Sequence, residues 1–272
     1  MELPIAPQTY QPSPDALVRA IKRADLILAR MVAEETALEG ATAMTNPRRP
    51  GVHMANFAAD LRVPEGSTAD AVLDEIADHF QSRNLACHYM QCNETHWPDD
   101  LAQSLSRRGY QRGPTASVCL LHDYTPPKRD MPAMQVIPGR AAYAQLQEFY
   151  VQSARDHHGA DDALAAQIAQ SQIDHLDEPR FDMFVGRIDG RIAGIAGVIT
   201  LGNIGVIDNV YTAPQFRGRG VASALMHHTI EHCSRALFEQ VILEVLADSR
   251  ALPLYESLGF KPVASYHKFV RP

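Results

Sequence analysis

The chain has few cysteines, no long apolar run and no excess of positive charge. Its four cysteines, Cys87, Cys92, Cys119 and Cys233, form neither a C-x-x-C pair nor a Cys/His spacing typical of a metal site. We therefore expect reduced thiols, a cytoplasmic location and no bound metal. No apolar stretch approaches the roughly 20 residues of a membrane span, and the N-terminus lacks the pattern of a secretory signal.

The charge balance is acidic, with 25 Lys and Arg against 32 Asp and Glu and a net charge of -7. This balance argues against nucleic acid as the main partner, and it is compatible with a cationic substrate such as an amine. We also expect no membrane partner. At 272 residues the chain can form one large domain or two smaller ones. Its oligomeric state is not encoded in any pattern, and a homo-oligomer stays open.

Periodicity and turn signals predict helices alternating with strands in the first part of the chain. The predicted helices span about 15–37, 69–83 and 99–108, the strands lie near 53–61, 86–93 and 116–122, and residues 40–51 read as a loop. Residues 125–132, TPPKRDMP, contain three prolines and three charges and are typical of a linker. We therefore expect two domains, residues 1–130 and 131–272.

The second part is richer in strands. Strands are predicted near 134–137, 181–188, 192–201, 205–212, 241–246 and 263–270, and helices over about 140–155, 161–175, 220–236 and 250–258. Asp189-Gly190 is a hairpin turn signal between two of these strands, and Gly259 is a helix C-cap residue.

A constant offset of 150 residues relates the two parts. It pairs Gly259-Phe260 with Gly109-Tyr110, Pro214 with Pro64, and Glu244 with Glu94. Such an offset suggests a tandem duplication, with chance agreement of a few pairs as the alternative.

The stretch YTAPQFRGRGVASALM, residues 211–226, joins a predicted strand to a predicted helix. The first turn of a helix exposes N–H groups and the positive end of its dipole, and Gly218 and Gly220 remove side chains where a ligand must approach. Arg217 and Arg219 add positive charge. This pattern predicts a cradle for a pyrophosphate, the alternative being a tight turn with exposed arginines. Its spacing matches neither the dinucleotide fingerprint nor the P-loop.

Gln215 to Ala222 resembles the Q/R-x-x-G-x-G/A signature of the GNAT superfamily of acyl-CoA-dependent N-acyltransferases. LPLYESLGF, residues 252–260, is similar to the C-terminal motif of that family. The resemblance covers about residues 134–272. It implies an α/β (α+β) fold with a mixed, mostly antiparallel central sheet flanked by helices, in tandem if the N-terminal half is a degenerate repeat. It also implies acetyl-CoA as co-substrate.

The resemblance assigns the cofactor contacts. Backbone N–H groups of the signature would hold the pyrophosphate of CoA, and the preceding strand would pair with its pantetheine arm. The implied cofactor-binding residues are Val210, Tyr211, Thr212, Gln215, Phe216, Arg217, Gly218, Arg219, Gly220, Val221, Ala222 and Ser223. Asp248, seven residues before Tyr255, stands where the family often has an asparagine that contacts pantetheine.

The resemblance also implies catalytic roles. Tyr255 matches the family tyrosine near the thioester sulfur, and a phenol can protonate a leaving thiolate. An ammonium must lose a proton before it attacks. The early strand glutamate that some members use is missing, so Asp208 and Glu244 are its candidate substitutes, directly or through water. The alternatives are a core tyrosine and two polar strand-end residues.

The N-terminal half lacks these parts. At the offset of 150, the positions matching Tyr255, Gly218 and Gly220 are Leu105, Thr68 and Asp70. Leucine is no acid, and an aspartate repels phosphate, so we expect this half to shape the acceptor pocket or to cover the catalytic half. His228 and His232 have helical i, i+4 spacing but lack a third ligand, and we interpret them as a solvated helix face.

These observations predict an N-acetyltransferase acting on a small-molecule or peptide amine. Two alternatives stay open at this point. One is a CoA-binding regulatory module without turnover, and the other is an enzyme that uses a longer acyl-CoA.

Overall fold

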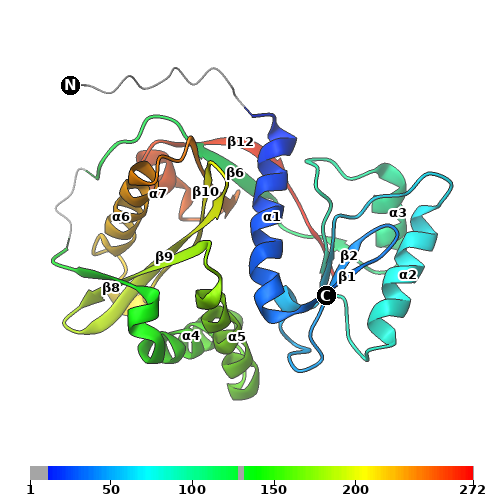
Figure 1. The fold of residues 1–272 in the computed structure, drawn as a ribbon, viewed down its shortest axis with the longest axis horizontal. Helices are drawn as coiled ribbons and strands as arrows, with labels where there is room; N and C mark the ends of the chain where they lie inside the picture. Colours follow the sequence, from blue (N-terminus) through cyan, green and yellow to red (C-terminus); the bar gives the residue numbers. More distant parts are fainter. Residues whose placement is uncertain (1–11, 128–131, 272) are drawn as a thin grey trace.

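A computed structural model describes residues 12–127 and 132–271, so part of the predicted linker, residues 128–131, lies outside the described residues. The long helix α1 (Pro14–Val32) runs between two sheets, with one half of the chain on each side (Figure 1). Ser13 caps its start by accepting a hydrogen bond from the Ala16 N–H (3.2 Å). In the described part of the chain, no helix is long and apolar enough to span a membrane.

The N-terminal sheet has the order β1-β2-β3-β4-β13-β5. Its strands are β1 (Glu34–Ala37), β2 (Thr42–Thr45), β3 (Phe57–Ala59), β4 (Tyr89–Met90), β5 (Gln111–Arg112) and β13 (Phe269–Val270). Helices α2 (Ala69–Gln81) and α3 (Asp99–Arg107) pack on it, and the short helix η1 (His53–Ala55) precedes β3. The buried side chains of α2 and α3 form one apolar cluster with Ala43, Ala58, Met90 and Phe269 of the strands.

The C-terminal sheet has the order β12-β6-β11-β10-β9-β8-β7. Its strands are β6 (Ala116–Leu121), β7 (Gln135–Pro138), β8 (Phe181–Ile188), β9 (Arg191–Leu201), β10 (Ile204–Thr212), β11 (Gln240–Leu246) and β12 (Phe260–Tyr266). One face packs on α1, α4 (Tyr143–His158) and α5 (Asp162–Asp174), and the other packs on α6 (Val221–Arg235) and α7 (Leu252–Ser257). Short helices η2 (Gly139–Ala142), η3 (His175–Asp177) and η4 (Pro214–Phe216) complete this half.

The two halves are two copies of one topology. In each, three antiparallel strands (β1-β2-β3 and β8-β9-β10) are followed by a parallel neighbour, β4 or β11. Gly109 follows α3 and Gly259 follows α7, both with positive φ, and their N–H groups bond the carbonyls three residues earlier at 3.1 and 3.0 Å. This agreement supports the predicted duplication.

The structural correspondence departs from the constant offset. The parallel pairs align Ala58 with Met90 in one repeat and Ile207 with Leu243 in the other, and left-handed residues follow at Asp60 (φ 57°) and Asn209 (φ 58°). The counterpart of Glu244 is therefore Gln91, not Glu94. The helix caps Thr68 and Gly220 correspond, at an offset of 152 (220 − 68). Differences in loop length explain why the offset between corresponding residues is not constant.

The repeats exchange one strand each. β6, from the first repeat, lies between β11 and β12, while β13, at the end of the second repeat, lies between β4 and β5. The predicted single strand over residues 263–270 is therefore wrong, because β12 and β13 belong to different sheets. The division at residue 130 stays a prediction, and each sheet takes a strand from across it.

Two further expectations in the first repeat differ from the structure. The helix predicted over 15–37 ends at Val32, and the following residues form β1. The segment 40–51, expected as a loop, contains β2. Both strands have only four residues, too few to show a period of two.

Candidate functional site

The C-terminal sheet opens between β10 and β11. The two strands pair only from Ile204 with Gln240 to Ile207 with Leu243, although both continue beyond this point. A β-bulge at residues 209–210 shifts the pairing of β10 with β9. The bulge and the lost pairing leave a wedge-shaped opening beside Val210, Tyr211 and Thr212.

On one face of the sheet, β10 leads through η4 and a glycine turn into α6. Gly218 (φ 74°) and Gly220 (φ 79°) take left-handed conformations, and Gly220 is an N-cap without a side-chain hydrogen bond. The N–H of Ala224 donates to the Gly220 carbonyl (3.0 Å), so the N–H groups of residues 221–223 precede the first helical bond. Among the described residues, a Cβ at Gly218 would meet nothing within 4 Å. The described part of the chain therefore leaves this turn open to an anion.

The side chains of this turn hold it in place. Phe216 and Val221 are buried in the core under α6, and Arg217 Nε donates to the carbonyl of Thr212 (3.2 Å). The guanidinium of Arg219 lies 5.4 Å from the centroid of the Phe216 ring. Gln215 is exposed, and Ala222 and Ser223 are half-buried. Asp248 is exposed in the turn after β11, across the opening from β10.

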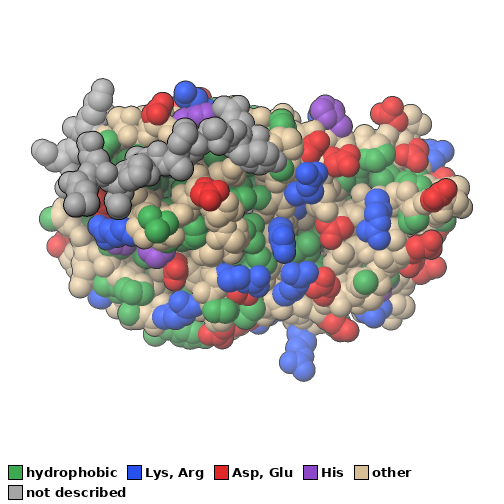
Figure 2. Space-filling model, turned by 45° about the horizontal axis from the view of Figure 1, so that its top comes forward, with side chains coloured by type: hydrophobic (Ala, Val, Ile, Leu, Met, Phe, Trp, Pro, Cys, Tyr) green, Lys and Arg blue, Asp and Glu red, His purple; other side chains and the backbone are tan. Residues whose placement is uncertain are grey.

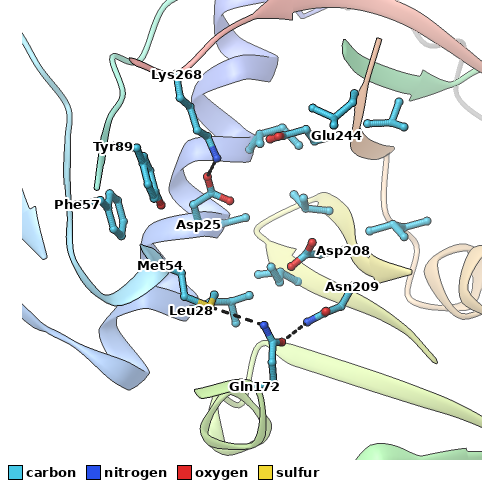
Figure 3. Close-up of a pocket in the computed structure, with 17 residues that line it drawn as sticks. Asp25, Leu28, Met54, Phe57, Tyr89, Gln172, Asp208, Asn209, Glu244 and Lys268 are labelled. Carbon is cyan, nitrogen blue, oxygen red and sulfur yellow. Dashed lines mark hydrogen bonds and ion pairs between the residues drawn. The ribbon is translucent and has the colours of Figure 1, made fainter. Parts of the chain in front are cut away.

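On the other face, the opening leads into a cavity of about 390 Å³ (Figure 3). Its walls come from β10 and β11, from α1 and α5, from the first repeat and from the link between β12 and β13. The polar side chains that line it are Asp25, Tyr89, Gln172, Asp208, Asn209, Glu244 and Lys268. Asp208 and Glu244, the two candidate bases named from the sequence, both line this cavity, together with residues that no motif contains.

Asp208 points into this cavity (Figure 3). Its side chain is exposed at the cavity, and the protein atoms around it still displace part of its hydration. Desolvation raises its pKa to about 6, and the negative charges of Asp25 and Glu244 add to the rise, against a backbone hydrogen bond from Asn209. In the described part of the chain, no side chain pairs with it. Asp208 can therefore gain and lose a proton near neutral pH.

Glu244 has the opposite character. Burial acts to raise its pKa, but the ammonium groups of Lys268 and Lys22 and a hydrogen bond from the Tyr266 hydroxyl outweigh it and leave the pKa below its ordinary value. Lys22 itself is buried, with Nζ 3.5 Å from the centroid of the Tyr266 ring. Glu244 is thus held as a fixed anion.

Two more contacts organise the cavity wall. Lys268 Nζ lies 3.3 Å from Asp25 Oδ2, which joins the β12–β13 link to α1. Asn209 Nδ2 donates to Gln172 Oε1 (2.7 Å), so the bulge residue is tied to α5. Figure 3 shows both contacts at the rim of the cavity.

Tyr255 lies in α7, which follows β11, and its ring meets Phe260 edge-on with centroids 6.2 Å apart. Desolvation raises the pKa of Tyr255 to about 12, and the negative charge of Asp208 adds to the rise. The phenol is therefore protonated at neutral pH and electrostatically coupled to Asp208.

Sequence reasoning missed Asp25, Tyr89, Gln172 and Lys268. One signal was available, because Asp25 lies between Ile21 and Leu28 on the apolar face of α1, where a charge is out of place. The others belong to no pattern.

The face of α1 that points away from the cavity carries positively charged side chains. A groove of about 780 Å³ there is lined by Arg19, Arg23, Arg30 and Arg180. Figure 2 shows Lys and Arg side chains gathered near the middle of one face. Arg30 and Arg180 are paired with Glu35 and Glu178. The concentration of unbalanced carboxylates is thus a property of the cavity, not of α1 as a whole.

The described residues contain no cluster of three His, Cys, Asp or Glu able to hold a metal ion. His228 and His232 pack edge-on against Phe184, with centroids 4.7 and 5.1 Å away, and His232 Nε2 lies 3.3 Å from Asp182 Oδ2.

Residues 142–260 match the model of the acetyltransferase (GNAT) family. A GCN5-related N-acetyltransferase from Kribbella flavida is similar in structure, with a TM-score of 0.63 at 12% identity, over 94% of this chain and 95% of that one. A functionally unknown conserved protein from Staphylococcus epidermidis has a TM-score of 0.62 at 15% identity, over 89% and 94% of the two chains.

A tandem GNAT protein from the clavulanic acid biosynthesis pathway is also similar, with a TM-score of 0.50 at 16% identity, over 79% of this chain and 73% of that one. No curated protein sequence matches the chain. These likenesses agree with the predicted fold, a mixed and mostly antiparallel sheet flanked by helices and built in tandem. The second half of the chain, over residues 142–260, is a member of the GNAT family of acetyltransferases.

Proposed function

We propose that the protein is an N-acetyltransferase that transfers the acetyl group of acetyl-CoA to a primary amine by direct attack. One observation carries this proposal. The open glycine turn before α6 and the acidic cavity lie on the two faces of the same opening between β10 and β11. A thioester held through that opening would meet an amine in the cavity.

The residues present fit CoA. The N–H groups of residues 218–223 and the positive end of α6 would hold the diphosphate, because the turn carries no competing cap and no side chain at Gly218. The edge of β10 from Val210 to Thr212 would pair with the pantetheine arm. Bound acetyl-CoA supplies an acyl group that is activated as a thioester.

Asp208 and Tyr255 would carry out the two proton transfers of the reaction. Asp208 accepts the proton that the ammonium of the acceptor releases, so that the amine nitrogen can bond to the carbonyl carbon. As the carbon–sulfur bond breaks, Tyr255 donates its phenolic proton to the sulfur. Glu244 stays ionised and favours the positively charged acceptor.

The two proton transfers are coupled. The negative charge of Asp208 contributes to the raised pKa of Tyr255. When Asp208 takes up the proton of the amine, that contribution disappears and the pKa of Tyr255 falls. The phenol therefore becomes a stronger acid at the moment when the thiolate leaves.

Thiol release from acetyl-CoA across a panel of amines tests the proposal. We expect turnover by the wild type and about 100-fold lower kcat for Tyr255→Phe, since general acid catalysis typically contributes 10²–10⁴-fold. CoA affinity, measured by calorimetry, should not change. Tyr143→Phe is the matched control, because Tyr143 is 48% exposed at the start of α4.

Two outcomes favour the alternatives. CoA binding without thiol release from any amine would identify a CoA-binding module. Faster turnover with butanoyl-CoA or octanoyl-CoA than with acetyl-CoA would identify an enzyme for longer acyl chains.

A further inference from the structure

The first repeat lacks the parts that hold acyl-CoA, yet it forms one wall of the cavity. Met54 in η1, Phe57 in β3 and Tyr89 in β4 all line it. Asp25 comes from α1, and Lys268 comes from the link that carries the chain from β12 into the first sheet. Figure 3 shows these side chains facing Asp208 and Glu244 across the cavity. The acceptor side of the site is therefore built by both repeats.

The charges in this cavity do not balance. Three carboxylates line it, those of Asp25, Asp208 and Glu244, against the single ammonium of Lys268. Lys268 pairs with Asp25. Lys22 does not line the cavity, and burial lowers its pKa to about 7, so that at neutral pH its ammonium offsets the charge of Glu244 only in part. Protonation of Asp208 by the reacting amine still leaves more negative than positive charge on the walls. A second positive charge on the acceptor would compensate this excess of negative charge.

The wall from the first repeat suits such a charge. The rings of Phe57 and Tyr89 are stacked, with centroids 4.6 Å apart and planes at 10°. Lys268 Nζ already lies 5.2 Å from the centroid of the Tyr89 ring. An aromatic face beside a carboxylate attracts cations through its quadrupole, and Leu28 and Met54 provide apolar surface for a carbon chain.

The size of the cavity limits the acceptor. A volume of about 390 Å³ is near the lower end of the range for sites that bind small molecules. Side chains of α1 and of the first repeat stand on the side of the cavity opposite β10 and β11, which leaves a small acceptor more room than a protein chain.

We propose that the first repeat is the acceptor-recognition half of the protein, and that the acceptor is a small aliphatic amine with a second positive charge. Its reacting nitrogen lies at Asp208, and its remote ammonium faces Asp25 and the Phe57–Tyr89 wall. This inference rests on the proposed acyl transfer and adds the class of acceptor.

Three acceptors of matched chain length test the inference, namely 1,4-diaminobutane, butylamine and 4-aminobutanoate. Each has four carbon atoms, and the remote end carries an ammonium group, a methyl group or a carboxylate. We expect kcat/KM for the diamine to exceed that for butylamine at least tenfold, with 4-aminobutanoate lowest. Equal values for the three, or a preference for 4-aminobutanoate at Lys268, would overturn the inference.

Substitutions test which side chain causes the preference for the diamine. Asp25→Asn should raise KM for the diamine about tenfold more than KM for butylamine. Both are measured at a pH above the pKa of Asp208, because the charge of Asp25 also acts on that carboxyl. Asp25→Glu should restore part of the preference. Arg23→Gln, on the opposite face of α1, is the control and should change neither. Thermal unfolding of each variant shows whether it is folded. An equal loss with diamine and butylamine in a folded Asp25→Asn protein would contradict the inference.

The two proposals fail in different ways. Turnover of butylamine without a preference for the diamine keeps the acetyltransferase and removes the acceptor class. Absence of turnover with every amine, while CoA still binds, removes both.

Discussion

The starts of α2 and α6 occupy the same place in the two repeats and are satisfied in different ways. At α2, Thr68 Oγ1 accepts a hydrogen bond from the Ala71 N–H (3.2 Å), and Asp70 in the first turn lies 3.1 Å from Arg107. At α6, Gly220 provides no side chain. One helix start is capped by a side chain of its own sequence and the other is not. The proposed diphosphate site at the start of α6 depends on this difference.

The two repeats also differ at the strand positions of the proposed catalytic residues. Ala59 and the buried Gln91 stand where the second repeat has Asp208 and Glu244, and Leu105 stands where it has Tyr255. The first repeat keeps the topology and has replaced each proposed proton carrier with a side chain that does not titrate.

The largest effect is expected from building the missing cap, with Gly220→Thr. The new side chain would cap α6, and the left-handed backbone (φ 79°) would be strained. Loss of two charge-assisted hydrogen bonds, worth about 1.5–3 kcal/mol each, predicts at least 100-fold weaker CoA binding in calorimetry.

The matched control is Gly66→Thr in the loop before α2, where Gly66 has φ 80° and open space around a Cβ. It carries the same strain and should leave CoA affinity unchanged. Unchanged affinity in Gly220→Thr would show that the turn before α6 is not the diphosphate site.

Asp208→Asn makes the second repeat resemble the first at the proposed base. We expect kcat to fall about 100-fold, as is typical when a general base is lost. In the wild type, kcat/KM should rise with pH with a midpoint near 6, because only the deprotonated carboxylate accepts a proton. The asparagine variant should lose this acidic limb.

Glu244→Gln, measured over the same pH range, distinguishes the role of Glu244 from that of Asp208. The pKa of Glu244 lies below its ordinary value, so this variant should lower kcat/KM and keep a titration on the acidic side. A flat wild-type profile between pH 5 and about 7 would argue against Asp208 as the base.

The smallest effect is expected in the first repeat. Thr68→Ala removes the α2 cap and should lower the free energy of unfolding by about 1 kcal/mol in urea titrations. CoA affinity and kcat should not change. Ser13→Ala removes the cap of α1 and should cost a similar amount. A loss of CoA binding in Thr68→Ala would mean that the first repeat holds the cofactor after all.

Much of the second repeat was predictable from its sequence. β8, β9, β10 and β11 are apolar runs bounded by turn residues, and the glycine turn and Tyr255 lie in recognisable motifs. These signals are local, so they survive without knowledge of the neighbours. Asp208 is a candidate base from its place on the strand before the turn, and its proposed role stays a prediction.

The cavity wall was not predictable in this way. Asp25, Tyr89 and Lys268 are far apart in the sequence and meet only because α1 and the exchanged strands bring the repeats together. The exchange itself leaves no trace in composition, since β6 and β13 would pair equally well by pattern with either sheet. Charges on an apolar helix face, such as Asp25, are the one local hint.

The exchange of β6 and β13 has a consequence for synthesis. β5 ends at Arg112 and β13 begins at Phe269, so the first sheet waits for a strand made 157 residues later (269 − 112). At about 5–20 residues per second, that delay is roughly 10–30 s. During this time β4 and β5 emerge from the ribosome with unpaired edges, which other chains could join. The half translated first is therefore the half completed last, and nascent chains of this protein should engage chaperones until β13 arrives.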